Sequence, residues 1–289
     1  MSYSYQDYWR ALHQRKNLSA VGQSSLSEDI NKWIYRSTRR NLSRFARRHN
    51  LRAKGSRRML EVGVGTGYWV DFWQKLGWTV DGCDLVPAAV DALTQRHPAA
   101  QFWQADVSSS DGLLDQSGGI AAEGYDLVTA TNVLLHVTED EAFARALANV
   151  AAAVKPGGHL LLVEPALTMK KQHAPYHPAR SSRARVLAAY RKPLRDLGLK
   201  LVTVEPTTIL AANPLEASSK RKLSRYQAWW RLVAKSRQRP STVRWVGPAM
   251  YVLDALLMRT KEAPTSKILL FRRPRRVSRS TSSVAPKSA

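Results

Sequence analysis

Cysteine is almost absent from this sequence: Cys83 is the only one among 289 residues. A single thiol can form no disulfide within the chain and cannot supply a cysteine cluster for zinc or iron. The sequence therefore excludes an internally disulfide-stapled fold and a cysteine-based metal centre. Because disulfides accompany oxidising compartments, we expect a cytoplasmic protein without a metal ion.

Long hydrophobic runs are missing as well. The longest apolar stretches, around residues 160–163 and 250–258, fall far short of the roughly 20 residues that cross a bilayer. The charged start, apolar core and cleavage site of an export signal are not found, so we expect neither export nor a membrane span. An apolar fraction of 44% with 23% charged residues instead indicates a globular chain with a sizeable core.

Acidic residues are scarce, with 22 Asp and Glu against 45 Lys and Arg, and the net charge is +23. The imbalance is segregated, because the net charge is +9 in residues 1–54, −8 in residues 55–165 and +22 in residues 166–289. Such a surface is either solvated or the footprint of an anionic partner. Composition leaves both interpretations open.

From residue 58 onward, short apolar strands alternate with helices. The pattern predicts helices at 68–76, 87–95, 139–154 and 183–197, a turn at 155–158, and strands at 58–62, 78–84, 101–105, 125–131, 159–164, 200–204 and 267–272. This alternation predicts an α/β fold with a mostly parallel seven-stranded sheet and helices on both faces.

The segments outside this alternation differ from it. Before residue 55, apolar residues recur at three-to-four spacing among arginines, which predicts an amphipathic helix that folds back as a lid around Trp33, Tyr35 and Arg36. About 60 residues separate the last two strands, too many for a hairpin loop, which predicts a cap with helices of its own. The chain is therefore divided into a helical lid (1–54), a core (55–205), a cap insertion (206–266), a final core strand (267–273) and a disordered basic tail (274–289).

The stretch "MLEVGVGTGYW" places three glycines, Gly63, Gly65 and Gly67, directly after the first strand. Glycines at alternate positions do not suit a strand interior, but they suit a sharp turn whose bare backbone meets a ligand before a helix begins. The spacing departs from the G-x-G-x-x-G of dinucleotide sites. Glu61 would point an anion toward the same place, which favours a cationic ligand over a pyrophosphate.

Four further motifs follow in order. Asp84 ends the second strand, Asp106 follows the third in "FWQADV", "ATNVLLHV" ends the fourth, and "VKPGGHLLLVEP" contains the fifth. Together with the glycine turn, residues 58–164 resemble the class I S-adenosylmethionine-dependent methyltransferases. The resemblance is greatest to the small-molecule, type 11/12-like branch that includes quinone and sarcosine-type enzymes. It implies a Rossmann-like fold and S-adenosyl-L-methionine as cofactor.

The resemblance also implies roles for individual residues. Those expected around the methionine part of the cofactor are Glu61, Gly63, Gly65 and Gly67, with Thr131 and Asn132 at its edge. Asp84 is expected to hold the ribose, and Asp106 and the Val107 amide the adenine. The structural alternatives are a surface acid at a strand end for Asp84 and a helix N-cap for Asp106.

Methyl transfer from a sulfonium needs alignment of an unprotonated nucleophile, and a base helps only when the acceptor is a weakly acidic O–H or N–H. His136, at the carboxyl edge of the predicted sheet, is the candidate base, with a loop-orienting role as its alternative. His173, Tyr176 and His177 lie in the loop after the fifth strand, where the acceptor is expected.

Three functions remain open. The first is a methyltransferase for a small-molecule or lipid-linked acceptor, which can be anionic, with transfer to oxygen. The second is an RNA methyltransferase whose basic ends grip phosphates, and the third is a non-catalytic cofactor-binding scaffold. The N/D-P-P-Y/F turn of DNA amino-methyltransferases is missing, which disfavours nucleic acid. The cations and tryptophans of the cap suit either a solvated helix or peripheral contact with an anionic membrane.

Overall fold

The computed structural model describes Trp9, residues 22–23, 25–55, 57–113, Gln116, 124–176, 181–236, 240–260 and 262–275. All but the first two residues of the predicted tail (274–289) lie outside the described residues. Within the described part of the chain, no helix is long and apolar enough to cross a membrane.

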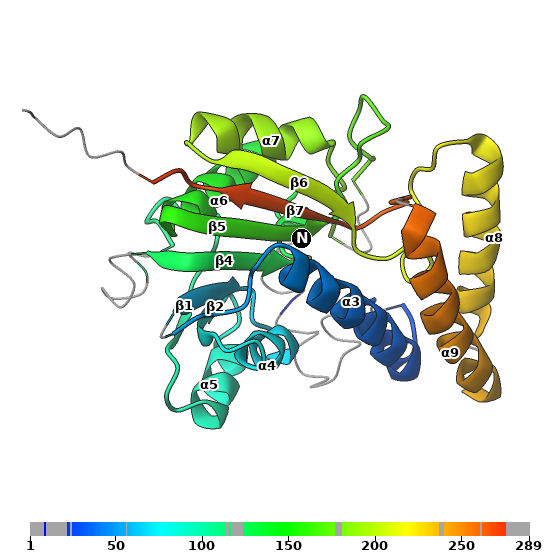
Figure 1. Cartoon of the computed structure of the whole chain (residues 1–289), viewed down its shortest axis with the longest axis horizontal. Helices are drawn as coiled ribbons and strands as arrows, with labels where there is room; N and C mark the ends of the chain where they lie inside the picture. Colours follow the sequence, from blue (N-terminus) through cyan, green and yellow to red (C-terminus); the bar gives the residue numbers. More distant parts are fainter. Residues whose placement is uncertain are drawn as a thin grey trace, which may run out of the picture.

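A seven-stranded sheet forms the centre of the molecule, in the order β3-β2-β1-β4-β5-β7-β6 (Figure 1). The first five strands are parallel, and β7 runs antiparallel to both β5 and β6. The bounds are β1 Arg58–Val62, β2 Thr79–Asp84, β3 Phe102–Gln104, β4 Tyr125–Thr131, β5 Val154–Glu164, β6 Lys200–Pro206 and β7 Lys267–Arg272. The strand order reverses between β1 and β4, which in open α/β sheets marks the place where ligands bind.

Helices cover both faces of the sheet, as predicted. The described helices of this core are α3 Glu28–Arg48, α4 Tyr68–Gln74, α5 Pro87–Arg96, α6 Asp140–Ala152 and α7 Leu187–Asp196, with a single 3₁₀ turn η2 at Leu134–His136. The cap contributes α8 Lys220–Lys235, α9 Pro240–Leu257 and the 3₁₀ turn η5 Met258–Thr260. Figure 1 shows α8 and α9 as a hairpin projecting beyond the end of the sheet, beside α3.

Two predicted boundaries differ from the structure by more than two residues. The expected turn at 155–158 belongs to β5, because the backbone of Gly157 and Gly158 pairs with Arg273 just after β7. The helix expected from residue 183 begins at Leu187. The residues just before it pair with other segments of the chain. The Arg183 N–H donates to the Leu135 carbonyl, and Val186 forms an isolated parallel β-bridge with Leu167.

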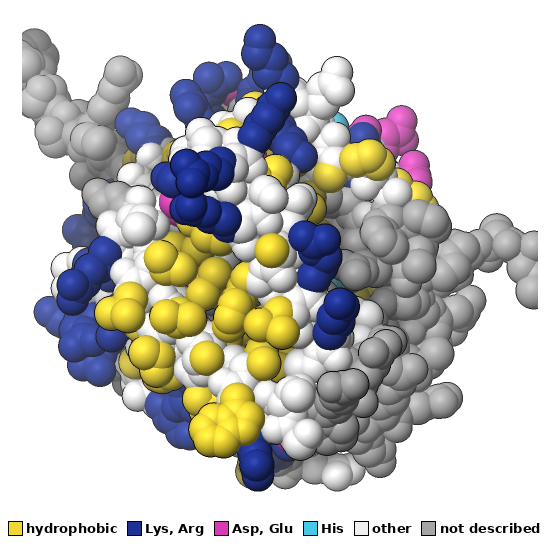
Figure 2. All heavy atoms as spheres, turned by 90° about the vertical axis from the view of Figure 1, so that its right-hand side faces the viewer, with side chains coloured by type: hydrophobic (Ala, Val, Ile, Leu, Met, Phe, Trp, Pro, Cys, Tyr) yellow, Lys and Arg dark blue, Asp and Glu magenta, His cyan; other side chains and the backbone are white. Residues whose placement is uncertain are grey.

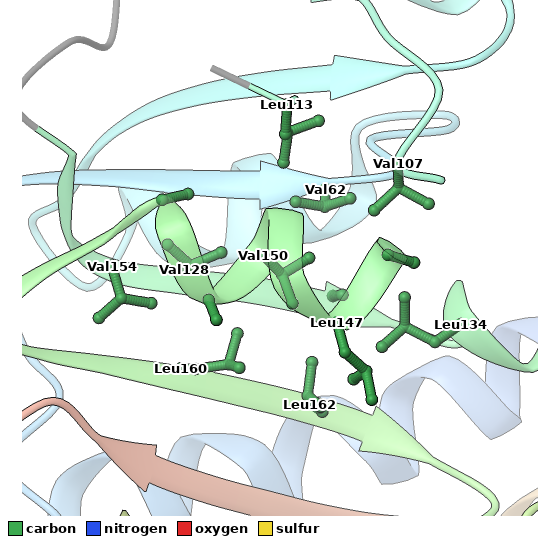
Figure 3. Packing of buried hydrophobic residues seen from close by; sticks show 14 of the residues in the cluster. Val62, Val107, Leu113, Val128, Leu134, Leu147, Val150, Val154, Leu160 and Leu162 are labelled. Carbon is green, nitrogen blue, oxygen red and sulfur yellow. The ribbon is translucent and has the colours of Figure 1, made fainter. Parts of the chain in front are cut away.

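Side chains alternate between the two faces of the sheet along each strand, so the core has one apolar cluster on each face. One apolar cluster lies under α6 and α7, and Figure 3 shows part of it, with Leu147 and Val150 of α6 facing Leu160 and Leu162 of β5. A second cluster on the opposite face packs α3 and α4 against the sheet, with Trp73 completely buried. Since both faces are covered, the strands read as nearly continuous apolar runs.

A third cluster joins the lid helix to the cap. Leu26 lies just before α3 and Ile30 within it. Both belong to one apolar cluster with Val233 of α8 and with Val243 and Met250 of α9. The ring of Trp33 lies so close to α9 that a Cβ added at Gly247 would be 2.1 Å from it. The predicted lid and cap therefore share one core, and neither packs independently of the other.

Asp254 of α9 connects this third cluster to the sheet. Its fully buried carboxylate accepts the backbone N–H groups of Ile209 and Leu210 at 2.7 and 2.9 Å, in the segment that follows β6. Its other oxygen accepts from Arg40 and Asn41 of α3, each at 3.0 Å. One carboxylate thus fixes α3, α9 and the chain after β6 relative to one another.

We expect Asp254→Ala to lower the free energy of unfolding by about 3–5 kcal/mol, because it leaves the largely buried Arg40 guanidinium without its counter-ion and the backbone N–H groups of Ile209 and Leu210 without an acceptor. Urea unfolding followed by circular dichroism measures this loss. Asp196→Ala, which removes an exposed partner of Arg195, serves as the control and should cost no more than about 1 kcal/mol. Equal losses in the two variants would contradict the role assigned to Asp254.

Candidate functional site

A cavity of about 870 Å³, open to solvent, lies at the carboxyl edge of the sheet where the strand order reverses. Its wall comes from the ends of β1, β2, β3 and β4, from α3 and α4, and from η2. Eight of the predicted site residues line it: Gly63, Gly65, Asp84, Asp106, Val107, Thr131, Asn132 and His136.

The glycine turn forms the floor of the cavity. Gly63, Gly65 and Gly67 all have positive φ, from 51° to 79°, which other residues rarely adopt. A Cβ at Gly63 would come within 2.5 Å of the Val133 side chain. At Gly67, the N-cap of α4, it would come within 2.0 Å of Arg96, so this glycine is required for packing and does not line the cavity.

Two aspartates, one after each neighbouring strand, supply the polar groups of the wall. Asp84, 8% exposed, accepts the N–H groups of Gly65 at 2.8 Å and Val86 at 2.9 Å, so it also fixes the shape of the glycine turn. Asp106 accepts the N–H and hydroxyl of Ser108, both at 2.8 Å. The alternative was a helix N-cap, but the described residues 107–113 form turns and no helix, so Asp106 stabilises a turn and also lines the cavity.

The charges of the cavity are of one sign. Among the described residues that line it, Asp84 and Asp106 are the only charged ones, and no lysine or arginine is present. A negative wall suits a cationic ligand and disfavours a pyrophosphate. The sequence analysis attributed this preference for a cationic ligand to Glu61, but in the structure Asp84 and Asp106 provide it.

Glu61 itself does not line the cavity. Because side chains alternate along β1, its carboxyl faces away from Leu60 and Val62 and is fully buried, where Oε2 accepts from the Thr129 hydroxyl. Burial raises the pKa of Glu61 to about 8. The predicted anion pointing at the ligand is thus replaced by a buried carboxyl behind the glycine turn.

Aromatic rings that the sequence analysis did not assign to the cavity close its outer side. Tyr35 of α3 stacks on Trp69 with ring centroids 5.6 Å apart and meets the edge of Tyr68 at 4.8 Å. All three rings line the cavity, as does Trp9. Of the three residues named for the lid, Tyr35 lines the cavity, whereas Trp33 packs on α9 and Arg36 lies 4.8 Å over the Trp33 ring.

The loop after β4 is held from below by Glu164, at the end of β5. This buried carboxylate accepts three consecutive N–H groups, from Val133, Leu134 and Leu135, at 2.8 to 3.1 Å. Burial nevertheless raises the pKa of Glu164 to about 8. The sequence signal was an acid at the end of an apolar strand in "LLLVEP", and its effect is to position the 3₁₀ turn that carries His136.

His136 has a defined tautomer. Its Nδ1 lies 2.7 Å from the Ser181 carbonyl oxygen, an acceptor only, so Nδ1 carries the proton and Nε2 has the lone pair. Burial lowers the pKa of His136 to about 4, which keeps the ring neutral near pH 7. Trp9 meets the ring edge-on at 4.7 Å.

A second cavity adjoins the first, with Trp9, Tyr35, Asn132 and His136 lining both. It measures about 1400 Å³ including its open mouth, and its far wall is the segment after β6, from Thr207 to Leu215. Apart from the neutral His136, no acidic or basic side chain occurs among the described residues that line it. His136 therefore stands at the junction between a negative cavity and an uncharged one.

The predicted acceptor residues are placed differently by the structure. Ala174 and Pro175 line the second cavity, but His173 and Tyr176 do not. The Nδ1 atom of His173 accepts the Val186 N–H at 3.1 Å, which ties the loop to the start of α7, and Tyr176 is 44% exposed. His177 lies outside the described residues.

The residues present fit S-adenosylmethionine. Its cationic sulfonium complements the negative wall formed by Asp84 and Asp106, and the positive-φ turn at Gly63 and Gly65 presents backbone to the cavity. Cys83 also lines the wall, but burial raises the pKa of its thiol, so it is not a nucleophile. The described residues contain no group of three or more His, Cys, Asp or Glu suited to a metal ion.

The buried carboxyl of Glu61 makes stability depend on pH. Its folded pKa of about 8 lies above its ordinary value of 4.5, so the folded state binds this proton more tightly than the unfolded state does. The stability it contributes is complete below pH 4.5 and is lost as the pH rises through 8. Relative to Glu61→Gln, the wild type should lose about 1 kcal/mol per pH unit across this window.

Melting temperatures of the two proteins between pH 5 and pH 9 measure this difference. Glu28→Gln, which changes an exposed carboxyl at the start of α3, is the control and should follow the wild-type curve at every pH. Parallel curves for wild type and Glu61→Gln would show that Glu61 is ionised in the folded protein.

Comparison with known proteins supplies the family. A family profile described as a methyltransferase domain matches residues 30–204. A ubiquinone biosynthesis O-methyltransferase of Xanthomonas axonopodis pv. citri is 34% identical over 107 residues, 36% of this chain and 41% of that enzyme. A highly reducing polyketide synthase of Emericella nidulans is 33% identical over 121 residues, 37% of this chain and 4% of the synthase.

Among solved structures, the magnesium protoporphyrin IX methyltransferase of Synechocystis, with bound S-adenosylhomocysteine, is similar at a TM-score of 0.47. It is 15% identical, and the match covers 85% of each chain. The family match extends over more than half of the sequence. The chain belongs to the methyltransferase domain family, as a class I enzyme with S-adenosylmethionine as its cofactor.

Proposed function

We propose that this methyltransferase acts on an oxygen atom of a small-molecule or lipid-linked acceptor that carries a weakly acidic hydroxyl group. The observation that carries this proposal is His136, a neutral imidazole with its Nε2 lone pair available, at the junction of the two cavities. A phenolic hydroxyl is largely protonated at pH 7 and needs a base, whereas an unprotonated amine does not.

The first cavity would hold the cofactor. Asp84 would accept the ribose hydroxyls, Asp106 with the Val107 N–H would contact the adenine, and Thr131 and Asn132 would border the methionine end. Gly63 and Gly65 let the backbone approach closely, while Glu61 supports this turn from behind. When bound, S-adenosylmethionine supplies an electrophilic methyl group on a cationic sulfonium.

The second cavity would hold the acceptor. Its uncharged wall favours a neutral or aromatic body, so any anionic group of the acceptor would lie outside the cavity. His136 would receive the hydroxyl proton on Nε2, and Glu164 would hold its 3₁₀ turn in place. The similarity to ubiquinone biosynthesis O-methyltransferases supports an oxygen acceptor. An RNA acceptor is not favoured, because no cation is found among the described residues of this wall.

The cofactor assignment predicts that Asp84→Asn weakens S-adenosylmethionine binding by about 1–3 kcal/mol, the cost of leaving hydroxyl groups without their acceptor. Isothermal titration with the cofactor measures the loss. Asp91→Asn, which changes an exposed acid on the neighbouring helix α5, should leave the affinity unchanged. Wild-type affinity in Asp84→Asn, or NAD binding without S-adenosylmethionine binding, would contradict the assignment.

The base assignment predicts that His136→Gln lowers kcat by about 10²–10⁴-fold while S-adenosylmethionine still binds. A panel of catechols and matched anilines, incubated with labelled cofactor, supplies the acceptor for the assay. In the wild type, kcat/KM with a catechol should fall only as the pH drops toward 4, because the imidazole must be neutral to accept the proton.

This acidic limb should disappear in His136→Gln. Its persistence would assign the limb to another group and reduce His136 to an orienting residue. Methylation of anilines in preference to catechols would replace the oxygen acceptor with nitrogen.

A further inference from the structure

The cap exposes a cluster of large apolar side chains. Of the nine large hydrophobic residues that are exposed in the described part of the chain, five lie on α8 and α9, and we call them the cap patch: Leu232, Trp245, Val252, Leu253 and Leu256, from 42% to 70% exposed. Figure 2 shows apolar side chains gathered on this end of the molecule, with lysines and arginines around them.

The spacing of the cap patch is that of a helix surface. Trp245, Val252, Leu253 and Leu256 follow one another at intervals of seven, one and three residues, which places them on one face of α9. The opposite face carries the buried Asp254 and Met250. The patch is therefore an outer face of a well-anchored helix, and its side chains are not needed for the packing of the cap.

Positive charge surrounds the cap patch. Residues 220–260 contain ten lysines and arginines and a single acid, Asp254, which is buried and paired with Arg40. Seven of these cations are exposed and form no ion pair within the described residues: Lys220, Arg221, Arg225, Arg231, Lys235, Arg244 and Arg259. The exposed surface of the hairpin is thus both apolar and cationic.

The charge continues from α9 onto α3. A cleft that includes Tyr251, next to Val252 in the chain, is lined by Lys32, Arg36, Arg39, Arg40, Arg44 and Arg47. Arg40 is paired with Asp254 and Lys32 with Glu28 and Asp29. The remaining arginines leave the flank of the cap patch strongly positive.

We propose that the cap patch and its cationic border dock this protein onto an anionic lipid bilayer. Aliphatic side chains and a tryptophan can enter the boundary between headgroups and acyl chains, while arginine and lysine contact the lipid phosphates. A second copy of the chain fits less well, because a two-fold contact would bring the same cations face to face. RNA fits less well because four of the five patch residues are aliphatic and offer no ring on which bases stack.

Docking would bring the bilayer close to the acceptor cavity. The segment from Thr207 to Leu215 lines that cavity, and the backbone of Ile209 and Leu210 is bonded to Asp254, on the inner face of the helix that carries the patch. Membrane docking nevertheless stands apart from the acceptor chemistry, since it is measured without methyl transfer.

The test is cosedimentation of the full-length protein with vesicles at near-physiological salt. Vesicles of equal parts phosphatidylglycerol and phosphatidylcholine should bind at least tenfold more tightly than vesicles of phosphatidylcholine alone, and added salt should weaken binding. Val252→Glu/Leu256→Glu should reduce binding to the anionic vesicles at least tenfold. Arg221→Glu/Arg225→Glu should also reduce binding to the anionic vesicles, because it reverses two charges, and should leave binding to the neutral vesicles unchanged.

Leu197→Glu is the matched control. Leu197 is also an exposed leucine (39%), but it precedes β6, whereas the cap follows the end of β6. This variant should bind vesicles as the wild type does. All these positions are exposed, so unchanged melting temperatures should confirm that each variant is folded.

Three outcomes would overturn the proposal. The first is an absence of binding to anionic vesicles, and the second is binding that Val252→Glu/Leu256→Glu retains in full. The third is a dimer in light scattering, or an RNA complex at the same salt, that this variant disrupts while vesicles do not bind. The last outcome would assign the patch to self-association or to nucleic acid.

Discussion

The reversal of strand order between β1 and β4 is the constraint on which the rest of this structure depends. Neighbouring parallel strands place their carboxyl ends at one edge, and the connections on the two sides of the reversal leave in opposite directions, which opens a crevice. The glycine turn, Asp84, Asp106 and Thr131 are distant in the sequence, and each lines that crevice because each follows a strand. The site is a consequence of topology, and its residues supply the chemistry.

Two buried carboxyl groups support this edge from within the protein. Glu61 lies behind the glycine turn, and Glu164 receives the N–H groups that start the turn carrying His136. Both lie where burial favours the neutral form, and neither faces the ligand cavity. Glu164 shows that an acidic residue near the cavity can hold the backbone of the wall in place without lining the cavity itself.

The cap does more than extend the molecule. Through Asp254 it is joined to α3, whose Tyr35 closes the cofactor cavity, and to the segment that lines the acceptor cavity. The cap therefore lines one cavity directly and is joined through α3 to the wall of the other. The proposed bilayer contact of the cap patch would act through this connection.

The sequence by itself determined the sheet, the family and most of the cofactor cavity. Strand and helix periods are local properties, and the strands at 58–62, 125–131 and 267–272 formed at the predicted residues. Glycines and aspartates that directly follow strands were also readable, because the ends of parallel strands share an edge. The predicted cap helices likewise followed from composition and loop length.

Tertiary structure decided what depends on the direction of a side chain and on partners distant in the sequence. The alternation along β1 turned Glu61 into the interior, and the contact with Val186 drew His173 away from the acceptor cavity. The aromatic wall required α3 to meet α4, and the tautomer of His136 required the Ser181 carbonyl, 45 residues away. These features arise from contacts between segments whose relative positions no local pattern specifies, so only the folded chain could reveal them.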